Sequence, residues 1–170
     1  MQNCKLPGEM EKVQKTGKAK AIGVSNYLPQ HLEVTLATAK IPPVINQIEF
    51  HPYLQRQNLV PWAKSNGIVT AAFGPLATIT KAKLGPCDTP FAELAKKYSV
   101  SEEAVALRWC MDQYVVAITT SRKEERLKDY LEVTKFSLTV EEVEAIARTG
   151  MDKHFRGNNF MHNFPSDDRS

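Results

Sequence analysis

The stretch Lys18-Ala19-Lys20-Ala21-Ile22-Gly23-Val24-Ser25-Asn26-Tyr27 decides the fold that this sequence predicts. It follows Gly17, a residue typical of the end of a helix. Its apolar centre is too short for a helix and has the β-branched content of a strand buried on both faces. It ends at Ser25 and Asn26, whose side chains hydrogen-bond nearby backbone and open turns or cap helices. A short apolar strand followed by polar residues and a helix indicates the βα edge of an α/β protein, where ligands bind.

The same unit of a strand followed by a helix recurs four times along the chain. Alternation of this kind predicts a parallel α/β sheet with right-handed crossovers. Four units are too few to close a (β/α)8 barrel, which needs eight. The strands are expected at residues 19–24, 44–50, 68–73 and 115–118. Helices are expected at residues 7–15, 29–40, 58–66, 90–98 and 123–131 and after caps at Ser101 and Thr139, with residues 77–89 as a surface loop.

The composition is that of an ordinary globular protein and excludes several classes of function. The chain has 170 residues, of which 42% are hydrophobic and 24% charged, and its net charge of +3 is too small to indicate a nucleic-acid partner. No apolar run approaches the ~20 residues of a membrane span, and residues 1–10 lack the apolar core of a secretory signal. Cys4, Cys87 and Cys110 are an odd number at unrelated spacings. We therefore expect reduced thiols in a cytoplasmic protein without a metal site.

Polar side chains gather at the ends of the first two strands, and an aromatic ring follows at the end of the third. Ser25, Asn26 and Gln47 offer paired hydrogen-bond donors and acceptors that suit an amide. Phe73 offers a flat apolar face on which a ring can stack. Strand ends converge on one face of a barrel, so these four side chains are expected to share one ligand.

Basic and hydroxyl side chains follow the fourth strand. Ser121, Arg122, Lys123 and Arg126 lie near the start of a predicted helix, where anions bind favourably. An amide-bearing aromatic ring at one end and a phosphate at the other describe a nicotinamide dinucleotide that carries an additional phosphate.

Each of these features also has a purely structural explanation. Ser25 and Asn26 would serve as a helix cap, Gln47 would satisfy the barrel interior, and Phe73 would lie in the core. The basic run after Ser121 would form a solvated helix face, as such runs usually do. The sequence contains no Gly-x-Gly-x-x-Gly loop, so an open dinucleotide-binding sheet gains no support.

Five stretches taken together resemble the C-terminal half of an aldo-keto reductase. In order and spacing they cover about residues 9–150, nearly the whole chain. The Ile-Thr-Thr-Ser sequence at residues 118–121 and the Lys-His-Phe-Arg sequence at residues 153–156 are most similar to those of fungal ketoreductases. These enzymes reduce conjugated polyketones and α-keto amides. The five stretches are residues 17–27, 46–52, 72–76, 106–109 and 118–121, the last followed by Arg126.

The resemblance implies the second half of a (β/α)8 barrel that binds NADPH and transfers hydride to an aldehyde or ketone. Phe73 matches a stacking aromatic that is usually Tyr, Gly74 stands where Ser is common, and Thr120 stands where a Lys usually meets the 2′-phosphate. Arg122 would supply the displaced positive charge, and Asp129 occupies the usual adenine position. The cofactor-binding residues that the resemblance implies are Ser25, Asn26, Gln47, Phe73, Gly74, Leu76, Thr120, Ser121, Arg122, Arg126 and Asp129.

The resemblance supplies no catalytic residue. The acid/base set of the family (Asp, Tyr, Lys and His) is borne on the first four barrel strands, and His51 belongs to a His-Pro pair that is structural in the family. Residues 1–153 are therefore expected to form the cofactor half of a reductase for a small-molecule carbonyl substrate, inactive alone, with an irregular tail at 154–170. The alternatives are a non-catalytic half-barrel that binds dinucleotide weakly or pairs with another half, and a chain that does not fold stably alone. The open edges predict self-association.

Overall fold

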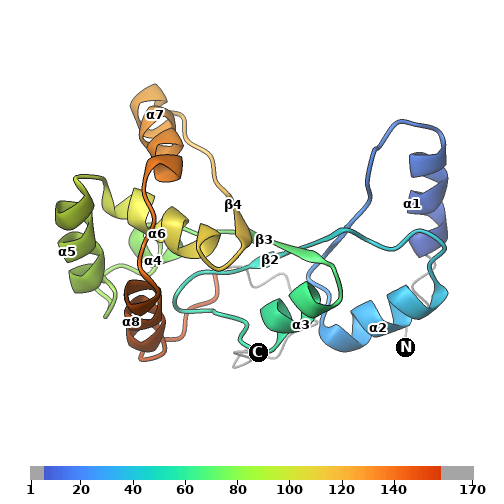
Figure 1. The fold of residues 1–170 in the computed structure, drawn as a ribbon, viewed down its shortest axis with the longest axis horizontal. Helices are drawn as coiled ribbons and strands as arrows, with labels where there is room; N and C mark the ends of the chain where they lie inside the picture. The colour runs from blue at the N-terminus through green and yellow to red at the C-terminus, as the bar shows by residue number, and fades with distance from the viewer. Residues whose placement is uncertain (1–5, 158–170) are drawn as a thin grey trace.

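Four parallel strands form one sheet at the centre of the molecule, as the computed structural model shows for residues 6–157 (Figure 1). Neighbouring strands in the sheet are also neighbours along the chain, and every pair is parallel. Each connection must therefore cross back over the sheet, and helices make these crossovers. The predicted parallel α/β half-barrel is confirmed. The strands are β1 (Val24–Ser25), β2 (Ile45–Glu49), β3 (Val69–Phe73) and β4 (Val115–Ile118).

The helices follow the order that the sequence predicts. One or more helices connect each pair of neighbouring strands, α1 precedes the sheet and α7 and α8 follow it. In Figure 1, α1 and α7 stand at opposite ends of the molecule, with the sheet between them. The helices are α1 (Leu6–Lys15), α2 (Pro29–Thr38), α3 (Leu59–Ser65), α4 (Ala77–Thr80), α5 (Asp88–Tyr98), α6 (Glu102–Met111), α7 (Glu124–Glu132) and α8 (Val140–Gly150), with the 3-10 helix η1 (Val133–Lys135) after α7.

The hydrophobic core lies between one face of the sheet and the helices that cover it. Ile48 and Ala72 are register partners on β2 and β3 and are fully buried on this face. Phe50 stacks on Trp109 of α6, with ring centroids 5.2 Å apart and an interplanar angle of 16°. The indole N–H of Trp109 donates to the Val143 carbonyl of α8 at 3.1 Å, so this buried polar group is satisfied. The core therefore joins β2, α6 and α8.

Two predicted caps begin the helices that complete this core. The Ser101 hydroxyl accepts a hydrogen bond from the Ala104 N–H at 3.0 Å. Thr139 and Glu142 form a reciprocal capping box at α8, with bonds of 3.3 and 2.8 Å. Each such cap satisfies helix N–H groups that would otherwise lack partners, and losing one costs about 0.5–2 kcal/mol.

Two sequence predictions of local structure were wrong. The first strand is Val24–Ser25 rather than residues 19–24, because only Val24 and Ser25 pair in register with β2. The segment 77–89 is not simply a surface loop: Ala77–Thr80 form α4, and Ala82 and Cys87 are buried. Its mixed, partly polar composition gave no sign that the small residues Ala82 and Cys87 pack inward.

The described cysteines are free and buried. Burial raises the pKa of both the Cys87 and Cys110 thiols, that of Cys87 to about 11, so neither is a ready nucleophile. Cys4 and the tail from residue 158 lie outside the described residues. Within residues 6–157 no group of His, Cys, Asp or Glu side chains is arranged to hold a metal ion. No helix in that range is long and apolar enough to cross a bilayer.

Candidate cofactor site

Three of the predicted ligands share one face of the sheet. Ser25 is the register partner of Gln47, and Gln47 is the partner of Ala71. Phe73 lies two residues beyond Ala71 and is the partner of Ile118. Because register partners share a face and side chains alternate along a strand, Ser25, Gln47 and Phe73 all point away from the core. The half-barrel therefore presents a hydroxyl, an amide and an aromatic ring together, near the carboxyl ends of β1 to β3.

Ser25 and Asn26 are fastened to the neighbouring strand rather than to the following helix. The Ser25 hydroxyl donates to the Gln47 carbonyl at 2.9 Å, and the Asn26 amide donates to the Ser25 oxygen at 2.6 Å. Asn26 has a φ of 59°, a left-handed conformation that Asn adopts more readily than most residues. The residue before α2 is Leu28, whose N–H donates to His31 Nδ1 at 3.2 Å. The alternative role of Ser25 and Asn26 as a helix cap is therefore wrong.

Asn46 positions this turn, and the sequence analysis gave it no role of its own. Its side-chain amide donates to the Tyr27 carbonyl at 2.9 Å, and its side-chain oxygen accepts the Tyr27 N–H at 3.3 Å. Asn46 is fully buried on the side of the sheet that faces the helices. From this side it holds residues 25–27 against β2. The signal in the sequence was an amide side chain inside an otherwise apolar strand start, since such a group needs buried partners.

The side chain of Gln47 is available to hydrogen-bond a ligand. Its side chain is half-buried and makes no hydrogen bond to another of the residues 6–157. An amide offers one acceptor and two donor hydrogens, which match the groups of a carboxamide ligand. Gln47 therefore suits an amide-bearing ligand.

The ring of Phe73 and the turn after it form the next part of the site. Phe73 is half-buried and ends β3, and Gly74 turns the chain with a φ of 64° that favours glycine. Leu76 lies in the core, so its side chain faces away from solvent. Of these residues, Phe73 and Gly74 are accessible to a ligand, whereas Leu76 would act through its backbone alone.

The basic residues lie beyond β4, next to this row of side chains. Thr120, Arg122 and Arg126 are exposed, and the Ser121 hydroxyl accepts the Lys123 N–H at 3.0 Å. β4 pairs with β3 and ends opposite Phe73, so this segment begins next to Phe73. Positive charge is thus available at the edge of the site that β4 forms.

Asp129 has a structural partner in addition to its predicted role. Its carboxylate accepts a hydrogen bond from the Ser101 hydroxyl, the same group that caps α6. This contact ties α7 to the start of α6. A carboxylate has further acceptor sites, so adenine binding by Asp129 stays a prediction.

A buried carboxylate at the end of β2 is the main feature that the sequence analysis missed. Glu49 is 4% exposed, and its Oε1 accepts the Gly157 N–H at 2.7 Å. The same oxygen lies 3.4 Å from His51 Nε2. Burial lowers the pKa of His51, with a smaller opposing effect of Glu49, which favours a neutral ring. The contact with Gly157 spans 108 positions along the chain, so no local pattern could have revealed it.

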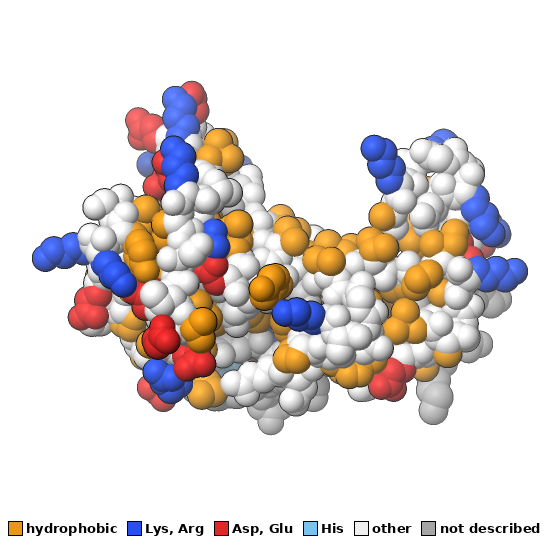
Figure 2. Space-filling model, in the orientation of Figure 1, with side chains coloured by type: hydrophobic (Ala, Val, Ile, Leu, Met, Phe, Trp, Pro, Cys, Tyr) orange, Lys and Arg blue, Asp and Glu red, His pale blue; other side chains and the backbone are white. Residues whose placement is uncertain are grey.

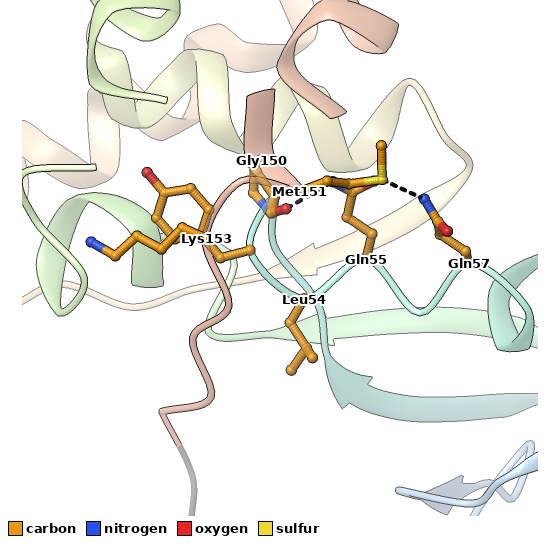
Figure 3. A pocket seen from close by; sticks show the side chains of 8 residues that line it. Leu54, Gln55, Gln57, Gly150, Met151 and Lys153 are labelled. Carbon is orange, nitrogen blue, oxygen red and sulfur yellow. Dashed lines mark hydrogen bonds between the residues drawn. The ribbon is translucent and has the colours of Figure 1, made fainter. Parts of the chain in front are cut away.

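A small cavity near residues 150–153 is separate from these side chains. Figure 3 shows Gln57 directed at Met151, and their contact from Nε2 to sulfur is 3.2 Å. Gln55 donates to the Pro52 and Ala147 carbonyls and closes one side of the cavity. Its volume is about 50 Å³. That is too small for a dinucleotide, since ligand pockets usually measure about 300–1,000 Å³.

Comparison with known proteins decides the family. A family description, "Aldo/keto reductase family", matches residues 3–150. The chain belongs to the aldo/keto reductase family. It is 37% identical over 150 residues to an NADPH-dependent alpha-keto amide reductase of Saccharomyces cerevisiae, covering 85% of this chain and 48% of that protein. It is 36% identical over 149 residues to an NAD/NADP-dependent indole-3-acetaldehyde reductase of Schizosaccharomyces pombe, covering 86% and 52%.

Solved aldo-keto reductases share the fold of this chain. A Bombyx mori aldo-keto reductase in complex with NADP superimposes with a TM-score of 0.81 at 28% identity, over 92% of this chain and 53% of that one. These structures are (β/α)8 barrels. The chain thus spans about half the length of the aldo-keto reductases that it matches, and its four strands correspond to the C-terminal half.

Proposed function

We propose that this chain is the cofactor-binding half of an NADPH-dependent aldo-keto reductase that reduces an aldehyde or ketone to an alcohol. The observation that carries the proposal is the row of Ser25, Gln47 and Phe73 on one face of the sheet, with Ser25 and Phe73 at strand ends and Gln47 in the middle of β2. The yeast relative is named as NADPH-dependent and the silkworm relative was solved with NADP, which supports the same cofactor here.

The residues present fit the nicotinamide end of that cofactor. Gln47 has an amide without a partner among the described residues, and Ser25 and Asn26 add a hydroxyl and a second amide beside it. The Phe73 ring would stack on the nicotinamide and exclude water from one of its faces. NADPH supplies the hydride when bound, and the chain's own part is to orient the ring that carries it.

The segment after β4 fits the phosphate end less completely. Arg122 and Arg126 would hold phosphates through their planar guanidinium groups, which pair with phosphate in two parallel hydrogen bonds. Ser121 would add a hydroxyl, while Thr120 brings no charge. The first turn of α7 contains Glu124 and Glu125, which oppose an anion there. The two arginines, rather than the N-terminus of α7, would therefore provide most of the attraction for the phosphates.

No residue of this chain is assigned to proton transfer. Among the described residues, the buried carboxylate beside this row is Glu49, which accepts the Gly157 N–H and lies next to His51. A carbonyl oxygen needs a proton as hydride arrives, so we expect little or no turnover from the chain alone. The carbonyl substrate would be a small molecule, and a cytoplasmic location stays a prediction.

Cofactor binding by the isolated chain tests the proposal. NADPH should quench the fluorescence of Trp62 or Trp109 on titration, and Phe73→Ala should weaken the binding at least fivefold. Phe136→Ala is the matched control, because Phe136 is also half-buried but packs against Tyr98, away from the row. No response at millimolar NADPH, or equal losses in both variants, would contradict the assignment.

A second candidate function is a non-catalytic half-barrel that binds a dinucleotide and pairs with another half. It is favoured by the exposed apolar side chains on the same face as Phe73, namely those of Val69, Val116 and Ile118. Both functions predict little or no turnover by the chain alone in an assay with NADPH and an activated ketone. Turnover at a rate usual for enzymes, on the order of 1–10³ per second, would therefore contradict both.

A further inference from the structure

A cavity lies between α3 and the turn that connects α6 to β4. Its floor is formed where β3 begins, at the buried residues Ile68 and Thr70. One wall carries Val60 and Lys64 of α3, and the other carries Tyr114 of the turn. β3 is an inner strand that pairs with β2 on one side and with β4 on the other, so the cavity borders neither outer edge of the sheet. Figure 2 shows basic and hydrophobic side chains next to each other over α3, which Figure 1 labels.

The size and lining of this cavity suit a small apolar molecule that carries a negative charge. Its volume is about 230 Å³, and an apolar cavity of about 150 Å³ is already large enough to bind benzene. Apolar residues line it, among them Val60, Ile68 and Val69. Lys64 brings a positive charge, and no acidic residue is among the described residues that line the cavity. An anionic group would therefore meet attraction and no opposing carboxylate.

The ammonium group of Lys64 is held at the cavity by an aromatic ring. Its Nζ lies 3.9 Å from the centroid of the Tyr114 ring, a cation–π contact. Other lysines of the described chain, such as Lys97 and Lys128, pair with a carboxylate. Lys64 forms no such pair within residues 6–157. A contact with a ring face leaves N–H groups of the ammonium available to an anion, since a lysine has three of them.

Tyr114 has a strained backbone that core packing does not explain. Its φ of 62° lies in the left-handed region, which a bulky residue rarely adopts. The Tyr114 N–H donates to the Met111 carbonyl at 2.9 Å, and the Gln113 amide donates to the Trp109 carbonyl at 2.8 Å, so the turn is fixed to the end of α6. The ring is nevertheless 76% exposed, so its burial does not offset the strain. Backbone strain of this kind gathers at ligand sites, where the surrounding structure maintains it.

We propose that this cavity binds a small hydrophobic carboxylate beside Tyr114. The apolar body of the ligand packs against Val60 and Ile68, and its carboxylate pairs with the Lys64 ammonium. The site lies where β3 begins, whereas Phe73 of the candidate cofactor site ends the same strand, about 13 Å away at roughly 3.3 Å per residue. The two sites are therefore separate, and this inference does not depend on whether the chain binds NADPH.

Titration of the isotope-labelled chain with phenylacetate, followed by NMR, tests this proposal directly. The amide signals of Gly67, Gln113 and Tyr114 should shift, with half-saturation below about 1 mM phenylacetate. Phenylacetamide has nearly the same shape and no charge, so it should bind at least fivefold more weakly. The affinity for phenylacetate should be the same with and without NADPH. An absence of shifts at millimolar phenylacetate, equal affinities for the two compounds, or shifts confined to the surroundings of Phe73 would overturn the proposal.

Substitutions of the two charged and aromatic partners separate a ligand site from an ordinary surface contact. Lys64→Met should weaken phenylacetate binding at least fivefold and leave phenylacetamide binding unchanged. Lys96→Met is the matched control, because Lys96 is an exposed lysine in the last turn of α5, as Lys64 is in α3. Equal effects of these two variants would contradict the role of Lys64.

Tyr114→Asn tests the strained turn. It should weaken the binding of both compounds and raise the urea midpoint, because asparagine adopts the left-handed conformation more readily than tyrosine. A lower midpoint, or unchanged binding of phenylacetate, would assign Tyr114 a structural role and contradict its part in the site.

Discussion

The two ends of the sheet are built from the same strand-and-helix unit and yet differ in packing. At the β4 end, α6 buries six of its ten residues, and Trp109 contacts Phe50, just after β2, and Val143 of α8. At the β1 end, the strand has two residues and α1 leaves Met10 and Val13 exposed. The local pattern is similar at both ends, so the difference shows that burial from several sides sets the length and stability of an element.

Removing the central ring of the β4 end should have the largest effect. Trp109→Ala should lower the free energy of unfolding by roughly 3–5 kcal/mol, because it leaves a cavity under Phe50 and removes the indole hydrogen bond to the Val143 carbonyl. Val13→Ala is the matched change at the β1 end and should cost less than about 1 kcal/mol. Urea unfolding measures both, and equal losses would remove the contrast between the two ends.

A glycine at the β4 end should tolerate no side chain. A Cβ on Gly150 would contact the Pro52 carbonyl oxygen and lie 2.8 Å from the carbonyl carbon, both of which are backbone atoms that cannot rotate away. Gly150→Ala should therefore destabilise the chain by about 1–3 kcal/mol. The expected signature is a lower urea midpoint, and an unchanged midpoint would show that α8 and the segment after β2 can separate freely.

The buried His51 should make stability depend on pH. Burial lowers its pKa in the folded chain below the unfolded value of 6.5, so between these values the unfolded chain binds the proton and the folded chain does not. Stability should fall as pH decreases below about 6.5, by about 1.4 kcal/mol for each pH unit until the folded pKa is reached. Unfolding measured from pH 7.5 to 5 checks this. His51→Gln should flatten the dependence of the free energy of unfolding on pH. If the variant shows the same dependence as the unchanged chain, other groups are responsible for it.

The smallest expected effect lies at the β1 end and has the opposite sign. Gly8 of α1 has no atom within 4 Å of an added Cβ. Gly8→Ala should stabilise α1 by about 0.5–1 kcal/mol, because alanine lowers the backbone entropy that helix formation costs. If α1 unfolds before the rest of the chain, the substitution should change the part of the unfolding curve that reports the helix content of α1. The midpoint of global unfolding should then stay the same. A destabilised helix signal would show that α1 packs more closely than its exposure indicates.

Most of the fold could be predicted from local rules. β4 has the bounds 115–118 that its apolar run predicted, and the caps at Ser101 and Thr139 begin α6 and α8. These signals are local because a cap or a short apolar strand is defined within a few residues. The same rules failed for β1, whose length depends on a neighbouring strand, and for the segment 77–89, whose buried residues depend on distant packing.

The candidate site could be predicted in part. The positions of Ser25, Gln47 and Phe73 at strand ends were visible in the sequence, and the register confirms that they share a face. The bonds from Asn46 to Tyr27 and from Glu49 to Gly157 were not visible, because they join residues far apart in the chain. The predicted cofactor contacts of Thr120, Ser121, Arg122, Arg126 and Asp129 stay predictions.

The sequence by itself determined the order of strands and helices and the chemical groups at each strand end. Apolar periodicity, turn residues and caps act over a few positions, so they can be recognised without a partner. Only the tertiary structure decided that α1 and α7 stand at the two outer edges of the sheet, and that residue 157 bonds to the end of β2. These placements arise from burial and from contacts between distant segments, which depend on how all the units pack together.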